Sequence, residues 1–195
     1  MTLQSRTQPT PIRSPRDDIV LHLPALRAFA LSLTRSPDRA DDLVQDTVEK
    51  AWRNIASFTP GTNLRGWLCT ILRNSYYSSL RKTRREVPDP DGVFVARLAV
   101  SPAHDGALAL REFLVAFAHL SPEHREVLTL VGALGFSYEE AAETTSLAIG
   151  TVKSRVSRAR AILSGLLQLQ AGESLLALPD GNLASVMSHA PVYAM

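Results

Sequence analysis

The 195-residue sequence contains one cysteine, few aromatic residues and no long uninterrupted hydrophobic run. The single cysteine, Cys69, excludes a disulfide framework and is expected to be a small core residue within the apolar segment WLCTILRN. The histidines lack the spacing of metal ligands. No apolar segment approaches the roughly 20 residues of a membrane-spanning helix, and no signal peptide is evident. These absences predict a cytoplasmic protein without a metal, a cofactor or membrane contact.

Acidic residues are also missing from one long stretch, between Arg65 and Arg85, although the net charge of the whole chain is only +2. Charge is therefore segregated along the chain rather than spread over it. The hydrophobic content of 45% is sufficient for packed cores in one or two small domains.

The segment from Ser137 to Leu163 predicts a helix-turn-helix. A short helix over 138–145 and a turn at 146–148 precede a longer helix over 149–167. Apolar residues recur along the longer helix at steps of three and four: Ile149, Val152, Val156, Ala159, Leu163 and Leu166. Its other faces carry basic and hydroxyl side chains and no acid, which suits a helix that enters the major groove. An ordinary amphipathic helix with a solvated basic face is the alternative.

Three further helices are predicted in the first half of the chain, over 17–34, 38–58 and 64–85. Ser36 and Pro37 suit the cap and the first turn of the second helix. Leu43, Val44, Val48, Ala51, Trp52 and Ile55 supply its expected buried side. The helix dipole accounts for acids in its first turn, but not for Gln45 and Asp46 beyond it. An enzyme that uses Asp41 and Asp42 would lack a nucleophile, a metal cluster and a phosphate loop, so we expect no enzymatic activity.

The third of these helices combines basic residues with aromatic ones. Charge that follows a nucleic-acid backbone, with rings on which bases stack, is typical of single-strand binding. Phe58, Tyr76 and Tyr77 are candidates for such stacking, and Tyr77 is the one expected to be exposed. Trp67 lies on the apolar face and is expected to be mostly core.

The predicted fold is all-α, with two small helical domains joined by a flexible linker rich in acids and proline. We expect a disordered lead over 1–16, a first domain over 17–85, the linker over 86–106, a second domain over 107–170 with the helix-turn-helix, and a tail over 171–195.

Four motifs in order carry a family resemblance: an acidic second helix, then NLRGWLCTILRN, LSPEHREVLTLV and SYEEAAETTSLAIGTVKSRVSRAR. Together they resemble the bacterial extracytoplasmic-function (ECF) sigma factors of RNA polymerase. The wording SFTPGTNLRGWLCTILRNSYYSSLRK, followed by REVPDPDG, looks most like the EcfG-type subgroup of the general stress response. A LuxR-like transcription regulator that binds DNA without polymerase is the alternative.

The resemblance implies three sets of binding residues. Residues matching the polymerase-docking position are Asp42, Gln45 and Asp46. Those matching the positions that open and bind the −10 promoter element are Phe58, Asn63, Arg73, Asn74, Tyr77, Arg81 and Lys82. Those matching the helix that reads the −35 element are Thr151, Lys153, Ser154, Arg155 and Arg158.

The resemblance also implies partners, namely core RNA polymerase (its β′ clamp helices and β flap), promoter DNA and a NepR-like anti-sigma factor. Two positions depart from the family pattern. Ser146 replaces the usual glycine of the turn, and Thr144 and Thr145 replace bulkier apolar residues.

Overall fold

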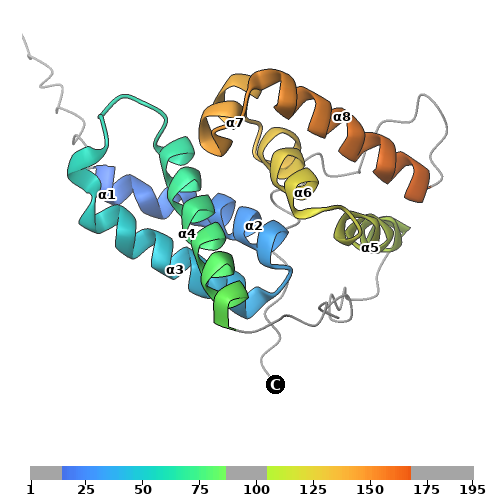
Figure 1. Cartoon of the computed structure of the whole chain (residues 1–195), viewed down its shortest axis with the longest axis horizontal. Coiled ribbons are helices and arrows are strands. Elements are labelled where there is room, and N and C mark those ends of the chain that lie inside the picture. The colour runs from blue at the N-terminus through green and yellow to red at the C-terminus, as the bar shows by residue number, and fades with distance from the viewer. Residues whose placement is uncertain (1–14, 87–104, 168–195) are drawn as a thin grey trace, which may run out of the picture.

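The computed structural model describes residues 15–86 and 105–167, called here the first and second halves (Figure 1). The described residues form helices and turns, without a strand. The helices are α1 (Pro15–Asp18), α2 (Leu23–Thr34), α3 (Pro37–Arg53), α4 (Leu64–Glu86), α5 (Asp105–Ala118), α6 (Pro122–Leu128), α7 (Tyr138–Thr145) and α8 (Ile149–Leu166). None of the helices in these two ranges is long and apolar enough to cross a membrane.

The predicted helices of the first half are confirmed, with shifted ends. Ser36 caps α3, because its hydroxyl accepts a hydrogen bond from the Arg39 backbone N–H at 3.4 Å, and Pro37 occupies the first turn. Helix α3 ends at Arg53, and a 3₁₀ turn over Ile55–Ser57 follows it. Another 3₁₀ turn, Ile19–His22, divides the helix expected over 17–34.

The second half contains the predicted helix-turn-helix, α7 and α8. Ser137 and Glu140 form a capping box at the start of α7, where each side chain accepts the other residue's backbone N–H. Ser146 ends α7 with a left-handed φ of 55°, and the Leu147 N–H reaches back to the Ala142 carbonyl at 3.1 Å. This sharp ending turns the chain directly into α8.

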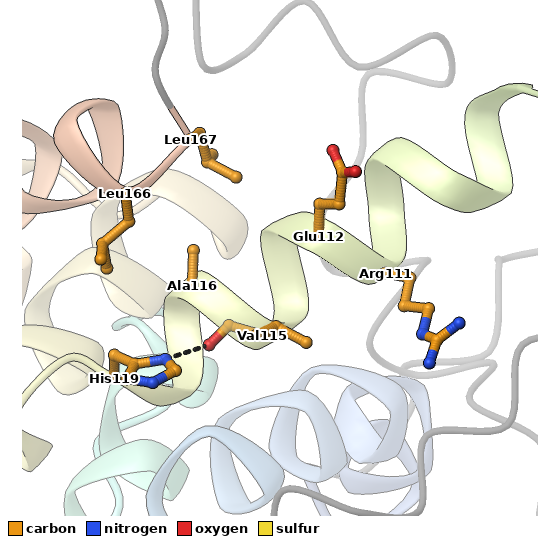
Figure 2. A pocket seen from close by; sticks show the side chains of 7 residues that line it. All are labelled: Arg111, Glu112, Val115, Ala116, His119, Leu166 and Leu167. Atoms are coloured by element: carbon orange, nitrogen blue, oxygen red, sulfur yellow. Dashed lines mark hydrogen bonds between the residues drawn. The ribbon is translucent and has the colours of Figure 1, made fainter.

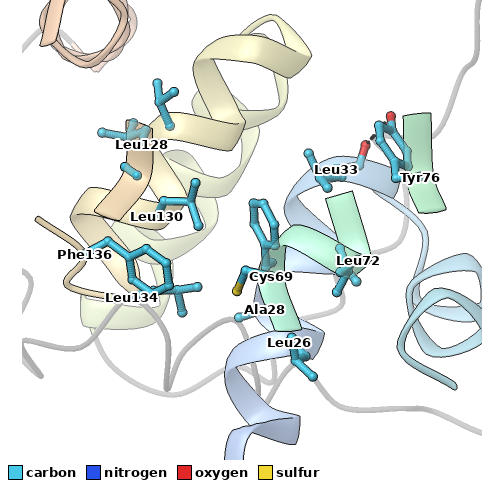
Figure 3. Close-up of a cluster of buried hydrophobic side chains, with 14 of the residues drawn as sticks. Leu26, Ala28, Leu33, Cys69, Leu72, Tyr76, Leu128, Leu130, Leu134 and Phe136 are labelled. Atoms are coloured by element: carbon cyan, nitrogen blue, oxygen red, sulfur yellow. Dashed lines mark hydrogen bonds between the residues drawn. The ribbon is translucent and has the colours of Figure 1, made fainter. Parts of the chain in front are cut away.

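The two halves pack against each other around one continuous core. Helix α4 lies against α7, and α2 lies against α6 and the π-helical turn Thr129–Ala133 (Figure 1). Figure 3 shows side chains from α2 and α4 beside those from residues 128–136, and all of them belong to one cluster of buried side chains. The core residues labelled there are Leu26, Ala28, Leu33, Cys69, Leu72, Tyr76, Leu128, Leu130, Leu134 and Phe136.

Three residues expected on buried stripes are exposed instead. Trp52 keeps 52% of its surface, Ile149 40% and Leu166 48%. Ile149 and Leu166 begin and end α8, where the stripe extends beyond the helices that cover Val152 and Leu163. Periodicity identified the right face of α8 but could not show how far the neighbouring helices reach.

The domain boundaries stay a prediction. Glu86 ends α4, and α5 begins at Asp105, so both ends of the expected linker 86–106 are helical. Residues 1–14, 87–104 and 168–195, which include most of the linker and the tail, lie outside the described residues.

Substituting Ser146 by glycine is expected to stabilise the protein. The left-handed conformation costs an L-residue about 1 kcal/mol or more, whereas glycine adopts it freely. We expect Ser146→Gly to raise the free energy of unfolding by about 0.5–1 kcal/mol, measured by urea denaturation.

Ser157→Gly, at an exposed position inside α8, is the matched control and should destabilise by about 0.5 kcal/mol. Equal destabilisation by both glycines would contradict the left-handed conformation of Ser146.

Candidate nucleic-acid and protein interfaces

The three predicted docking residues form an exposed ridge on α3. Asp42, Gln45 and Asp46 lie at helical spacing and are all exposed. The neighbouring acid Asp41 pairs with Arg27 at 2.8 Å, and Glu49 pairs with Arg53 at 2.8 Å. Asp42 and Asp46 form no ion pair with any residue of the two described ranges. Their carboxylates are therefore available to a partner.

Trp52 extends this ridge and was missed as a functional candidate. It follows Gln45 by seven residues, which places it within about 20° of Gln45 around an ideal helix. Its place among the apolar residues of this helix predicts a buried side chain instead. An exposed aromatic ring on the side of α3 that carries Gln45 is typical of a protein-binding surface.

The basic face of α4 divides into an exposed part and a covered part. Asn74, Arg81 and Lys82 are exposed, and Arg81 donates to the Ser78 hydroxyl at 3.1 Å. These side chains lie along the exposed side of α4, as binding of a single strand requires. The structure does not bring the other predicted residues of this set to the same open surface.

Phe58 is buried, contrary to its predicted role as a stacking residue. Only 8% of it is exposed, and its ring lies 5.4 Å from that of Trp67. The 3₁₀ turn before Phe58 directs the ring inward, onto the start of α4. Tyr76 is also buried, at 7% exposure, and its hydroxyl donates to the Leu33 carbonyl at 3.0 Å. Neither ring is available to stack on a base.

Arg73 and Tyr77 of α4 meet a carboxylate of the second half. Arg73 Nε donates to Glu126 Oε1 at 2.5 Å, and the Tyr77 hydroxyl donates to Glu126 Oε2 at 3.2 Å. The Arg73 guanidinium lies 4.8 Å from the centre of the Tyr77 ring. Tyr77, expected to be exposed, is half-buried because α6 covers it.

The electrostatics of this contact follow from its burial. The Glu126 side chain has 0% exposure, and burial raises its carboxyl pKa against the opposing pull of Arg73. Burial, and then the neighbouring Glu126, also raise the pKa of the Tyr77 hydroxyl. Tyr77 is therefore a hydrogen-bond donor at neutral pH, and Arg73 supplies the charge that Glu126 needs.

Asn63 has two structural partners that its predicted DNA role did not include. Its side-chain oxygen accepts the Gly66 backbone N–H at 2.9 Å, at the beginning of α4. Its side-chain nitrogen donates to Glu140 Oε1 at 2.6 Å, across the two halves. Asn63 is thus a capping residue, a role that its position three residues before Gly66 could have indicated.

The predicted reading residues of α8 occupy more than one face of that helix. At about 100° per residue, Lys153 and Arg155 lie about 200° apart, on opposite flanks of the buried stripe. Ser154 lies midway between them on the outer side, and Thr151 and Arg158 lie there nearer to Arg155. Arg155 is half-buried, and its charge contributes to lowering the pKa of Glu123. A single groove contact therefore favours the face that carries Ser154 and Arg158.

A cleft lies between α5 and the end of α8 (Figure 2). Within it, His119 hydrogen-bonds to the Val115 carbonyl at 2.8 Å. Its lining is Arg111, Glu112, Val115, Ala116, His119, Leu166 and Leu167. No group of His, Cys, Asp and Glu able to hold a metal occurs within 15–86 and 105–167.

Comparison with known proteins agrees with this geometry. Residues 19–86 match the Sigma-70 region 2 family and residues 110–163 match the Sigma-70, region 4 family. The chain is 50% identical over 172 residues to the ECF RNA polymerase sigma factor EcfG of Rhodopseudomonas palustris (strain TIE-1), covering 88% of this chain and 94% of the relative. The chain belongs to the ECF sigma factor family. It is also 31% identical over 142 residues to ECF sigma factor SigM of Bacillus subtilis (strain 168), covering 71% of this chain and 85% of SigM.

Solved structures give the same result. The sigma factor RpoE in complex with the anti-sigma factor NepR from Bartonella quintana is 53% identical, with a TM-score of 0.70, and the match covers 80% of this chain and 98% of that one. CnrH in complex with the cytosolic domain of CnrY is 26% identical, with a TM-score of 0.53, covering 80% of this chain and 89% of that one. The match over 19–86 replaces the LuxR-like alternative, in which these residues would form a sensor domain.

A substitution at Phe58 tests whether its ring packs in the core or contacts DNA. Because the ring is buried against Trp67, we expect Phe58→Ala to lower the free energy of unfolding by about 3–5 kcal/mol in urea denaturation. Phe58→Leu retains much of the buried volume and should cost less. An unchanged stability for Phe58→Ala would contradict burial and restore the stacking role.

Proposed function

We propose that this ECF sigma factor binds core RNA polymerase through α3 and directs it to promoters, which it opens with α4 and reads with α8. The observation that carries this proposal is the separation of three surfaces on one chain. An acidic exposed ridge lies on α3, an exposed basic face lies on α4, and a helix-turn-helix ends the second half. The match to both sigma-70 regions supports the same assignment.

Docking on the β′ clamp helices is assigned to Asp42, Gln45 and Asp46. The Asp42 and Asp46 carboxylates form no ion pair within the described ranges. A cationic partner can therefore bind them without first breaking an ion pair. Trp52 supplies exposed apolar area on the side of α3 that carries Gln45. Charge gives steering and specificity, while a large ring gives binding energy, and the ridge offers both.

Opening of the −10 element is assigned to the exposed part of α4, with Asn74, Arg81 and Lys82, and to Arg73 and Tyr77 once they are uncovered. A flipped base needs a polar pocket and a stacking partner that together compensate for lost stacking. Tyr77 with the Arg73 guanidinium against its ring is the aromatic surface best placed for this.

Reading of the −35 element is assigned to α8, with Thr151, Ser154, Arg155 and Arg158 toward base edges and Lys153 toward the DNA backbone. Arg158 is exposed, and its guanidinium has the paired donors that recognise guanine. Contact with the polymerase β flap is assigned to the second half on the family resemblance.

We also infer control by a NepR-like anti-sigma factor within a general stress response. Support comes from the 53% identical relative, whose structure contains NepR, and from the 50% identical EcfG. The chain acts as a non-enzymatic initiation factor in the cytoplasm, where the polymerase is located.

Reconstitution tests the proposed function. Core polymerase with this chain should produce run-off transcripts from stress-response promoters, and core polymerase alone should not. Combining Asp42→Ala, Gln45→Ala and Asp46→Ala should weaken holoenzyme assembly about tenfold or more, as expected for loss of several interfacial contacts. The melting temperature should stay nearly unchanged because all three side chains are exposed.

The control combines Glu139→Ala with Glu143→Ala, which removes two exposed acids from α7 instead. Equal core affinity for the wild type and the triple variant would refute the docking assignment. Absence of any chain-dependent transcript would refute the proposed function as a whole.

The two flanks of α8 are expected to differ in their effect on the holoenzyme. Arg158→Ala should cost about 1–3 kcal/mol of promoter binding and relax base preference within the −35 element, because it removes a bidentate base contact. Lys153→Ala should instead lower the salt slope of binding by about one and leave base preference unchanged. Titrations at several salt concentrations, on native and scrambled −35 sequences, separate the two. Identical behaviour of the variants would contradict the division of this helix.

A further inference from the structure

Gly150, the second residue of α8, has no neighbour within the described ranges that requires a glycine. It lies in regular helix, and nothing is found within 4 Å of the position that its Cβ atom would take. Gly61 and Gly135 differ, because their φ angles of 87° and 67° favour glycine. Gly66 differs as well, since its Cβ atom would lie 3.1 Å from the side-chain nitrogen of Asn63. An alanine at position 150 would therefore fit the folded chain without strain.

The glycine makes the beginning of α8 less stable than it could be. A glycine loses more conformational freedom on folding than an alanine does, so it is unfavourable in a helix. Ala148, the N-cap residue of α8, also has no side-chain acceptor for the first backbone N–H groups. By contrast, serines accept such hydrogen bonds at the beginnings of α3, α6 and α7. A requirement from outside the chain would explain why this helix begins with two unfavourable residues.

Gly150 lies on the side of α8 that is assigned to the −35 element. It precedes Ser154 by four residues, which places the two about 40° apart around an ideal helix and away from the buried Val152. Gly150 is exposed, and the Ser154 hydroxyl donates to the Thr151 carbonyl at 3.0 Å. The Ser154 side chain therefore lies along its own helix, and the surface around Gly150 is low.

We propose that Gly150 is a positioning residue for promoter recognition: the sugar–phosphate backbone of the −35 duplex occupies the space that a side chain at position 150 would fill. The inference rests on the proposed function, because it assumes that α8 enters the major groove. In that docking mode the first turns of the helix lie nearest to the base edges. Close contact with the DNA backbone at Gly150 then sets the depth and register at which Ser154 and Arg158 meet the bases.

A side chain at position 150 should have opposite effects on folding and on DNA binding. Alanine and leucine both favour a helix over glycine, so Gly150→Ala and Gly150→Leu should raise the melting temperature of the free chain by roughly 1–3 °C. In the holoenzyme, the methyl group of Gly150→Ala should weaken binding to the duplex promoter about tenfold, an effect comparable to one mismatched base pair. Gly150→Leu should weaken binding further, because its side chain is larger.

Gly165, the second residue from the end of α8, provides the matched control. It is also exposed, and nothing within the described ranges lies within 4 Å of its Cβ position. Gly165→Ala and Gly165→Leu should therefore raise the melting temperature in the same way and leave promoter binding unchanged.

The test is a titration of holoenzyme against a fluorescent duplex with the −35 and −10 elements of a promoter that it transcribes. A second template lacks the −35 element and is already open at the −10 element. The wild type and all four glycine variants should bind this second template equally, because polymerase docking and strand binding do not use position 150.

Equal binding of the duplex promoter by the wild type and both Gly150 variants would overturn the positioning role. The same loss of binding on the template without a −35 element would overturn it too. Arg158→Ala, measured alongside, separates this failure from that of the proposed function. If Arg158→Ala weakens duplex binding and the Gly150 variants do not, only the positioning role is refuted. If none of these variants weakens duplex binding, the assignment of α8 to the −35 element is refuted as well.

Discussion

A carboxylate with no exposed surface needs charged and hydrogen-bonded partners, and the position of Glu126 depends on this constraint. Its partners, Arg73 and Tyr77, lie on α4, so the ion pair fixes α6 against the first half of the chain. Apolar packing between residues 128–136 and helices α2 and α4 completes the junction (Figure 3). This one contact and the core around it hold the two sigma regions in their observed arrangement.

The remaining exposed surfaces follow from the amphipathic character of each helix. Helix α3 turns its apolar side to the core, and the opposite side carries carboxylates that Arg27 of α2 and Arg53 of α3 only partly neutralise. Helix α8 buries Val152, Val156, Ala159 and Leu163 and leaves its basic flanks outside. Each functional surface thus lies on the side of its helix that faces away from the buried apolar residues. The position of those apolar residues determines where the surface can lie.

Local features of the fold could be predicted from the sequence, whereas contacts between its halves could not. The capping residue Ser36 and the spacing of apolar residues along α8 are signals read within a few neighbouring positions. Phe58, Trp52 and Tyr77 were assigned to the wrong environment because exposure depends on which distant helix covers a residue. The Glu126–Arg73 pair has no local signature, since the segment EHREV reads as an ordinary helix start and the partner lies on a different helix.

The core shared by the two halves links their relative position to the stability of the whole chain. A protein that binds only in an open form loses apparent affinity in proportion to the fraction of molecules that are closed. Apolar side chains of this core, such as Leu130 and Phe136, would become exposed to water if the two halves separated, so separation would cost free energy. Sequence changes at buried positions of the junction, far from any residue that touches polymerase or DNA, would change that cost and alter how many polymerase molecules this sigma factor captures.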